Sequence, residues 1–264
     1  MHLSYSAIDL WRKCPFAFKL KKIDNINLFG GSIHSCFGSA VHDTIKNILL
    51  EQIADSQIDD HFKNYFKNEL KLISQTKKEE IFKNENTKET LRHMSTSGAY
   101  LCRQSIKFLL QKFPNYKIIQ VEQEFNEPIL IKSDADYDFK GIIDLIIQTP
   151  DGIYHVLDWK SCSWGWKAEK KTSKWVTYQL AYYKHYFSLQ NNIDLSNVHC
   201  HFGLIKRTAK KDNIEIFETS IGPRKIKNAL KIINNLIYNT EKGHFPKNRL
   251  SCKYCDYHRT QWCP

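Results

Sequence analysis

The stretch YDFKGIIDLIIQTPDGIYHVLDWK, residues 137–160, decides the fold of this chain of 264 residues. It contains two runs rich in β-branched and aromatic residues, Tyr137 to Ile147 and Ile153 to Trp159, joined by the turn sequence Thr149-Pro-Asp-Gly152. A similar run, Lys117 to Phe125, precedes them. Runs of this kind that are separated by Pro, Asp and Gly predict β-strands and a hairpin. We therefore expect a three-stranded antiparallel meander here.

Helical periodicity surrounds this region in the sequence. Apolar residues recur at helical spacing from Ala40 to Ile53, and residues 57–112 continue helical around a polar connection near 77–89. The patterns that follow the meander predict a helix over 174–188, strands over 198–205 and 213–219, and a helix over 223–239. We expect an α/β fold with a mixed sheet flanked by helices and with an N-terminal helical lobe.

The composition is that of a globular protein. Hydrophobic residues make up 42% of the chain, which is enough for a large buried core. No segment approaches the roughly 18 consecutive apolar residues of a membrane span, and the N-terminus MHLSYSAIDLWRK lacks the apolar stretch of a secretory signal. We therefore expect a cytoplasmic protein without a membrane partner, whose eight cysteines are thiols or metal ligands.

The basic charge is concentrated in the C-terminal part of the chain. Residues 1–159 carry 20 Lys and Arg against 21 Asp and Glu, whereas residues 160–264 carry 19 against 7. Trp164, Trp166 and Trp175 lie among these basic residues. This combination suits a polyanion that offers both phosphates and stackable bases, as nucleic acids do. A solvated basic surface is the alternative explanation.

Two carboxylates and a lysine are placed to meet at the hairpin. Asp158 and Lys160 share a face of their strand because side chains two apart point the same way, and Trp159 points to the other face. Asp144 lies on the partner strand, where it can reach the same end of the hairpin. An ordinary cross-strand ion pair is the alternative. The surrounding apolar strands favour a functional site.

Such a trio matches the requirements of phosphodiester hydrolysis. A hard cation polarises the phosphoryl oxygen and lowers the pKa of bound water, and Mg²⁺ or Mn²⁺ prefers carboxylate oxygens. Lys160 would orient the attacking water or stabilise developing charge. A lysine with a lowered pKa that acts as a base remains the other reading of this residue.

The cysteines fall into two groups by spacing. Cys252, Cys255 and Cys263 lie within 12 residues near the C-terminus, and Cys14 lies 238 residues before the first of them. Thiolates in a Cys-x-x-Cys arrangement select zinc or an iron-sulfur cluster. The other cysteines have no matching partners and are expected to be small buried residues: Cys36, Cys102, Cys162 and Cys200.

Taken together, these motifs resemble those of the RecB-like nucleases of the PD-(D/E)XK superfamily, which include CRISPR-adaptation nucleases and helicase-linked nuclease domains. The resemblance spans nearly the whole chain. Its elements occur in the family's order: Ser4 and Ser6 before Cys14-Pro15, Gly38-Ser-Ala-Val-His42, Gly141-Ile-Ile-Asp144, Asp158-Trp-Lys160, Gln179-Leu-Ala-Tyr-Tyr183, and Cys252-x-x-Cys255 with Cys263.

The resemblance implies a role for each polar residue of the hydrolytic site. The divalent metal would be bound by His42, Asp144, Asp158 and the main-chain carbonyl of Trp159. Lys160 would be the catalytic lysine. Gln179 and Tyr183, which share a helix face, would position the lysine or the DNA, with Tyr182 pointing elsewhere. Glu122 or Glu124, in the preceding strand, is a candidate for an additional carboxylate.

The resemblance also implies that Cys14, Cys252, Cys255 and Cys263 hold a [4Fe-4S] cluster that joins the two chain ends. The seven residues between Cys255 and Cys263 form a longer gap than is usual in the family. Zinc is therefore the alternative occupant, with His258 replacing Cys263 as a ligand.

The resulting prediction is a divalent-metal-dependent deoxyribonuclease, an exonuclease that prefers single-stranded ends, acting in repair, recombination, phage replication or CRISPR adaptation. The helical lobe would face the basic half, with DNA between them. The alternative is a non-catalytic DNA-binding scaffold for a helicase or integrase. The expected units are an N-terminal cysteine segment (1–24), the helical lobe with the motif histidine (25–115), the nuclease core (116–240) and the cysteine-rich segment (241–264).

Overall fold

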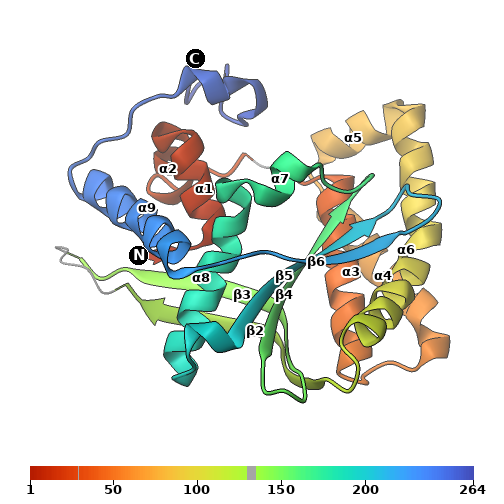
Figure 1. Cartoon of the computed structure of the whole chain (residues 1–264). Coiled ribbons are helices and arrows are strands. Elements are labelled where there is room, and N and C mark those ends of the chain that lie inside the picture. The colour runs from red at the N-terminus through yellow and green to blue at the C-terminus, as the bar shows by residue number, and fades with distance from the viewer. Residues whose placement is uncertain (29, 130–134) are drawn as a thin grey trace.

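The centre of the molecule is a mixed β-sheet. The computed structural model describes residues 1–28, 30–129 and 135–264. The strand order is β1-β3-β4-β5-β6, and β2 pairs with β3 beside this path (Figure 1). The strands are β1 (His2–Leu3), β2 (Lys117–Pro128), β3 (Asp138–Gln148), β4 (Tyr154–Cys162), β5 (Val198–Lys206) and β6 (Ile214–Glu218).

Helices cover both faces of the sheet, so that the molecule has three layers. One face packs against α1, α8 and α9, and the other packs against α3, α4 and α6 (Figure 1). The helices are α1 (Tyr5–Lys13), α2 (Pro15–Lys22), α3 (Ile33–Leu49), α4 (Ile58–Lys71), α5 (Gln75–Lys83), α6 (Glu85–Lys112), α7 (Ala168–Thr172), α8 (Lys174–Asn191) and α9 (Pro223–Glu241). Short 3-10 helices are η1 (Asp55–Gln57), η2 (Leu195–Asn197) and η3 (Arg249–Tyr254).

The predicted antiparallel meander is confirmed. Strands β2 and β4 both run antiparallel to β3. The hairpin between β3 and β4 closes through the N–H of Gly152, which donates to the carbonyl of Thr149 at 2.9 Å. Gly152 has a φ of +86°, which is favourable only for glycine. The later strands and the last helix also match their predicted ranges in β5, β6 and α9.

The prediction of an exposed connection near 77–89 is wrong. This segment forms α5 and the first turn of α6, which are separated only by Asn84. The side chain of Asn84 accepts a hydrogen bond from the N–H of Thr87 at 3.1 Å and caps α6. A polar segment thus stays helical because its own asparagine satisfies the free amides of the next helix.

Strands β3 and β4 separate part of the way along their length, and we call this point the fork. They pair from Leu145 opposite Leu157 to the end of the hairpin at Gln148 opposite Tyr154. Beyond the fork, β3 pairs instead with β1, and β4 continues beside β5 in parallel. Two strands that part in this way leave space between their backbones for polar side chains.

The helical N-terminal region shares a core with the sheet. Helices α3, α4 and α6 bury their apolar faces against sheet residues that include Leu145, Leu157 and Trp159. Helix α3 therefore lies directly on the sheet. In the described part of the chain, no helix has the length and apolar character needed to cross a membrane.

Candidate active site

The two predicted carboxylates stand at the fork. Asp144 directly precedes Leu145, the first paired residue of β3, and Asp158 directly follows Leu157 on β4. One oxygen of Asp144, Oδ2, accepts a hydrogen bond from the backbone N–H of Trp159 at 2.7 Å. The side chain of Asp144 thus bridges the gap where the strands stop pairing. The strand register places both acids at the same level of the sheet.

His42 reaches this fork from helix α3. Its Nδ1 lies 3.3 Å from Oδ1 of Asp144. Gly38, one turn earlier, faces β4, where a Cβ on Gly38 would lie 3.5 Å from Oγ of Ser161. Burial lowers the pKa of His42, but the nearby carboxylate of Asp144 outweighs burial and raises it above the ordinary value. Burial likewise opposes ionisation of Asp144, whose pKa is nevertheless lowered by His42.

Asp158 and Lys160 form a nearly enclosed ion pair. Nζ of Lys160 lies 2.6 Å from Oδ2 of Asp158, whose side chain is only 2% exposed. Burial raises the pKa of Asp158 to about 6 although Lys160 opposes this shift. Burial opposes the charge on Lys160, but Asp158 and Asp144 raise its pKa, so it is an ammonium at neutral pH.

Trp159 points away from the site, as predicted from the strand alternation. Its side chain is 1% exposed and lies in the core beneath α3, α4 and α6. The ring covers Gly203 on β5, where an added Cβ would come within 2.1 Å of it. A glycine opposite Trp159 thus makes room for the indole, and the tight packing holds the backbone between Asp158 and Lys160.

Helix α8 contributes the predicted glutamine and tyrosine. Nε2 of Gln179 donates to Oδ1 of Asp158 at 2.7 Å and to the hydroxyl of Tyr183 at 2.9 Å. Tyr182 points elsewhere, as predicted, and donates to the carbonyl of Ala229 at 2.9 Å. The helix spacing of four thus places Gln179 and Tyr183 together beside the carboxylate.

The two glutamates of the strand before the hairpin are engaged in ion pairs. Glu122 forms an ion pair with Lys46 of α3 at 2.7 Å, and Glu124 pairs with Lys140. Glu122 has a φ of +49°, which interrupts the regular alternation of β2 opposite the fork. The expectation of an extra carboxylate from Glu122 or Glu124 therefore stays a prediction.

The donors at the fork suit a hard divalent cation. Two carboxylates and an imidazole converge there, and carboxylate oxygens are the preferred ligands of Mg²⁺ and Mn²⁺. Oδ2 of Asp158 is buried, and its partner is the ammonium of Lys160 at 2.6 Å. Among the residues described, no three His, Cys, Asp or Glu side chains are already arranged to hold a metal. In the structure, Lys160 and His42 lie against the two carboxylates and offset their negative charge.

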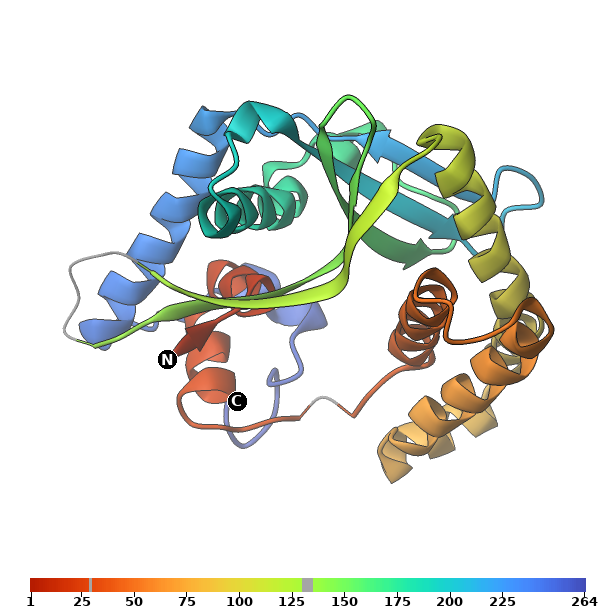
Figure 2. The same cartoon turned by 90° about the horizontal axis from the view of Figure 1, so that it is seen from below.

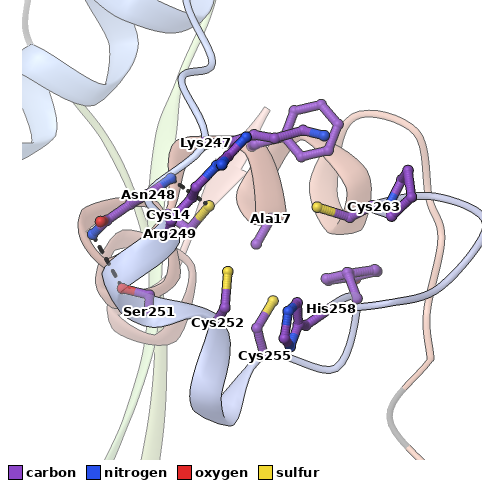
Figure 3. A pocket seen from close by; sticks show the side chains of 13 residues that line it. Cys14, Ala17, Lys247, Asn248, Arg249, Ser251, Cys252, Cys255, His258 and Cys263 are labelled. Carbon is purple, nitrogen blue, oxygen red and sulfur yellow. Dashed lines mark hydrogen bonds between the residues drawn. The ribbon is translucent and has the colours of Figure 1, made fainter.

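The four predicted cysteines of the chain ends line one cavity of about 460 Å³. Cys14 comes from the junction of α1 and α2, and the others come from η3 and the tail that follows it. Figure 3 shows the thiols of Cys14, Cys252, Cys255 and Cys263 around this cavity, with His258 beside them. We call this group of four the cysteine staple. Segments from opposite ends of the sequence thus lie side by side (Figure 2).

Hydrogen bonds hold the chain ends together around the staple. The N–H of Asn248 donates to Sγ of Cys14 at 3.4 Å, and its side chain donates to the carbonyl of Lys13 at 2.7 Å. Ser251 donates to the same carbonyl at 2.7 Å. Burial raises the pKa of the Cys255 thiol, and the neighbouring cysteines raise it further. Convergent thiols with an amide donor are suitable ligands for a thiolate-bound metal or cluster.

The remaining cysteines agree only in part with the sequence prediction. Cys36, Cys102 and Cys200 are at most 5% exposed, as expected of small buried residues. Cys162 is partly exposed instead, because it ends β4 where the strand leaves the core.

Tyr5 is a neighbour of the site that the sequence did not single out. It begins α1, and its hydroxyl donates to the carbonyl of Trp175 at 2.8 Å. Burial raises its pKa, and Asp9 and then Asp158 add to the shift. A lone tyrosine at a helix start carries no pattern that could have identified it.

Comparisons with known proteins found solved structures that are similar to this chain. No curated protein sequence matches the chain significantly. Among solved structures, a "Putative exonuclease" from Eubacterium rectale is 12% identical, covers 100% of this chain and 90% of its own, and gives a TM-score of 0.56. The protein SSO0001 is 12% identical over 97% of this chain and 83% of its own, with a TM-score of 0.44.

A family model assigns the chain to a superfamily. The model of the PD-(D/E)XK nuclease superfamily matches residues 2–264, nearly the whole chain. The fork, with its Asp144 and its Asp158-Trp-Lys160 sequence, lies at the centre of this match. The chain therefore belongs to the PD-(D/E)XK nuclease superfamily.

Proposed function

We propose that this protein is a Mg²⁺- or Mn²⁺-dependent deoxyribonuclease that degrades single-stranded DNA from its ends. The observation that carries the proposal is the convergence of Asp144, Asp158 and Lys160 at the fork, with Gln179 holding the second carboxylate. A solvated surface ion pair would not explain why Asp158 is almost fully enclosed.

His42, Asp144, Asp158 and the carbonyl of Trp159 would hold the cation. When bound, such a cation polarises a phosphoryl oxygen and lowers the pKa of water. Lys160 would stabilise negative charge on the phosphate or orient the attacking water.

The side chains around the fork restrict how the acids can move. Gln179 uses both hydrogens of its amide, on Asp158 and on Tyr183, and this fixes the orientation of the Asp158 carboxylate. The backbone N–H of Trp159 fixes Asp144 in the same way. A preorganised pair of acids loses little entropy when substrate and cation arrive.

Two features support a DNA end as the substrate. The excess of basic residues after residue 160 suits a polyanion. The structurally similar chain from Eubacterium rectale carries the name "Putative exonuclease". Repair, recombination, phage replication and CRISPR adaptation all produce such ends, and a helicase or integrase partner would supply them. Rapid cleavage of circular single-stranded DNA would contradict strict dependence on ends.

For the cysteine staple we propose a [4Fe-4S] cluster with a structural role. Four thiols from both chain ends surround one cavity, which is what a cuboidal cluster requires. Anaerobic purification followed by analysis of iron, sulfide and zinc tests this. A colourless protein that contains zinc would overturn the cluster in favour of the zinc site with His258.

The central experiment compares the wild type with Lys160→Ala on end-labelled single-stranded DNA and Mn²⁺. We expect the variant to lose about 100-fold or more of the rate, because an ammonium beside the phosphate is removed. Lys140→Ala is a matched control, since Lys140 is 50% exposed and pairs only with Glu124 on the outer strand. Equal rates for the wild type and Lys160→Ala would contradict the enzymatic function and leave a DNA-binding scaffold.

A further inference from the structure

The loop that follows β4 presents an exposed tryptophan on a fixed backbone. The N–H of Arg207 donates to the carbonyl of Cys162 at 2.9 Å, and Thr208 donates to the carbonyl of Ser163 through its N–H at 3.1 Å. Gly165, with a φ of +107°, turns the chain. Trp164 lies between these points and is 75% exposed. The loop is therefore anchored, although this large apolar side chain is mostly exposed.

Trp166, in the same loop, is packed against other aromatic side chains and differs in this from the exposed Trp164. Trp166 packs its ring against Phe202 and Phe217, with centroid distances of 5.0 and 6.2 Å. Nζ of Lys170 covers the ring at 4.5 Å. Trp166 thus anchors the loop in the core, which leaves Trp164 directed toward solvent. An exposed indole on a rigid loop is well suited to stack on a flat ligand.

Arg207 lies beside this loop as a buried cation without an acid. The residue is 8% exposed, and its Nη2 donates to Oγ of Ser163 at 2.8 Å. Its guanidinium lies 5.9 Å from the ring centre of Phe37. Among the described acids, none forms an ion pair with it, and burial lowers its pKa without a compensating carboxylate. Buried guanidinium groups are normally paired, so an anionic ligand is expected here.

Both residues lie close to the fork along the elements that build it. Phe37, under Arg207, is five residues before His42 on α3, which corresponds to about 8 Å along the helix axis. Trp164 is four residues after Lys160 and two residues past the end of β4, so the two residues are at most about 14 Å apart. A chain of a few nucleotides spans these intervals. Four lysines follow the loop closely in the chain, Lys167, Lys170, Lys171 and Lys174, and the side chain of Lys206 lies next to Gly165.

We propose that Trp164 and Arg207 form a nucleotide-binding subsite next to the reaction centre, in which the guanidinium binds a phosphate and the indole stacks on its base. The subsite rests on the proposed function and specifies its substrate. A base can lie flat on Trp164 only when it is unpaired and unstacked, so the subsite selects single-stranded DNA over duplex. The reacting phosphate would lie a few nucleotides away at the fork.

The test measures binding separately from cleavage. In a Lys160→Ala background, fluorescence anisotropy gives the affinity for a labelled oligothymidylate and for a series of oligonucleotides that each carry one abasic position. We expect Trp164→Ala to weaken binding about 5-fold or more, the usual loss for one base stacked on an aromatic residue. Tyr238→Ala, which removes an aromatic residue that is 60% exposed on α9, should leave the affinity unchanged.

The abasic series identifies stacking rather than a general loss of binding. When Trp164 is present, an abasic site at one position should lower the affinity. In Trp164→Ala, an abasic site at the same position should cause no additional loss of affinity. If the abasic profiles of the two proteins are identical, the stacking role is overturned. This outcome would leave the nuclease standing if Lys160 is still required for cleavage.

Arg207 requires a conservative variant because it is buried. Arg207→Lys keeps a cation but loses the planar set of guanidinium donors, so we expect it to bind the oligonucleotide more weakly. Replacing one phosphate by a neutral methylphosphonate should then reduce the affinity less than it does for the wild type. A circular dichroism melt checks that the variant is folded. A folded Arg207→Lys protein with unchanged affinity and unchanged methylphosphonate profile would overturn the phosphate role. Absence of cleavage by the wild type, with both profiles as expected, would overturn the nuclease and retain the subsite.

Discussion

The fork and the cysteine staple are assembled in opposite ways. At the fork, backbone pairing brings Asp144 and Asp158 to one level, and Gln179 and the N–H of Trp159 then fix their carboxylates. At the staple, segments 238 residues apart meet through a small apolar cluster and a few hydrogen bonds. The fork is held by the sheet, whereas the staple is held by this small cluster and these few hydrogen bonds.

This difference indicates how far the folding of each region depends on the metal or cluster proposed for it. Removal of a cation from the fork leaves Lys160 and His42 to balance the acids, so the sheet around it should stay folded. Removal of a metal or cluster from the staple leaves four thiols around a cavity of about 460 Å³ with little else to close it. Metal binding at such a site contributes directly to folding free energy. The first region should control rate, and the second should control stability.

The largest expected effect is on the rate at the fork. Asp158→Asn keeps the size of the side chain but removes the charge that faces Lys160 and would bind the cation. We expect hydrolysis of single-stranded DNA with Mn²⁺ to fall about 100- to 1000-fold. Iron content should equal that of the wild type. Loss of iron together with activity would show that the two regions are not independent.

The second effect concerns stability at the staple. Cys255→Ser should reduce iron or zinc content and lower Tm by about 5–10 °C, which corresponds to roughly 3 kcal/mol for a domain of this size. Cys36→Ala, at a cysteine outside the cavity, should keep the wild-type metal content. Differential scanning calorimetry with metal analysis measures both. Unchanged Tm and metal content in Cys255→Ser would remove the structural role of the staple.

The third effect is a pH dependence of cation binding at the fork. The pKa of Asp158 is raised to about 6, so its carboxylate takes up a proton as the pH falls through that value. Since metal ligands must be deprotonated and the pKa of His42, the other titrating ligand, is also raised, we expect Mn²⁺ affinity to begin to fall before the pH reaches 6 and to drop more steeply below it, by up to about 10-fold per pH unit for each group. Isothermal titration calorimetry between pH 5 and pH 8 measures this. A flat profile over that range would exclude Asp158 as the titrating ligand.

The smallest effect refines the role of helix α8. Tyr183→Phe removes the hydroxyl that accepts from Nε2 of Gln179 at 2.9 Å, but leaves the bond from Gln179 to Asp158. Loss of one hydrogen bond of about 1 kcal/mol predicts a decrease in rate of about 5-fold. Single-turnover cleavage resolves a change of this size. A loss as large as that of Asp158→Asn would instead give Tyr183 a direct part in the reaction.

The sequence predicted the local parts of the fork because each depends on a short-range rule. The turn at Thr149–Gly152 and the alternation of Asp158, Trp159 and Lys160 follow from neighbours in the chain. The capping of α6 by Asn84 was missed, since a polar segment of Lys, Glu and Asn is equally typical of a loop. The engagement of Glu122 by Lys46 was also missed, because the pair is 76 residues apart.

Arg207 shows most clearly what the sequence could not supply. In the sequence it is one basic residue among many in the C-terminal part. In the structure it is nearly buried, bonded to Ser163 and without a described acid partner. Burial depends on which segments cover a residue, and helix α3, which supplies Phe37, comes from the other end of the chain.

By itself, the sequence determined the strands and helices around the hairpin, the residue types of the candidate site and the grouping of the cysteines. These follow from periodicity, turn chemistry and spacing, which act over a few residues. Only the tertiary structure decided that β3 and β4 part at Asp144 and Asp158, that α3 brings His42 to them, and that Cys14 meets the C-terminal tail. Those outcomes depend on long-range packing, whose free energy belongs to the assembled layers and not to any single segment.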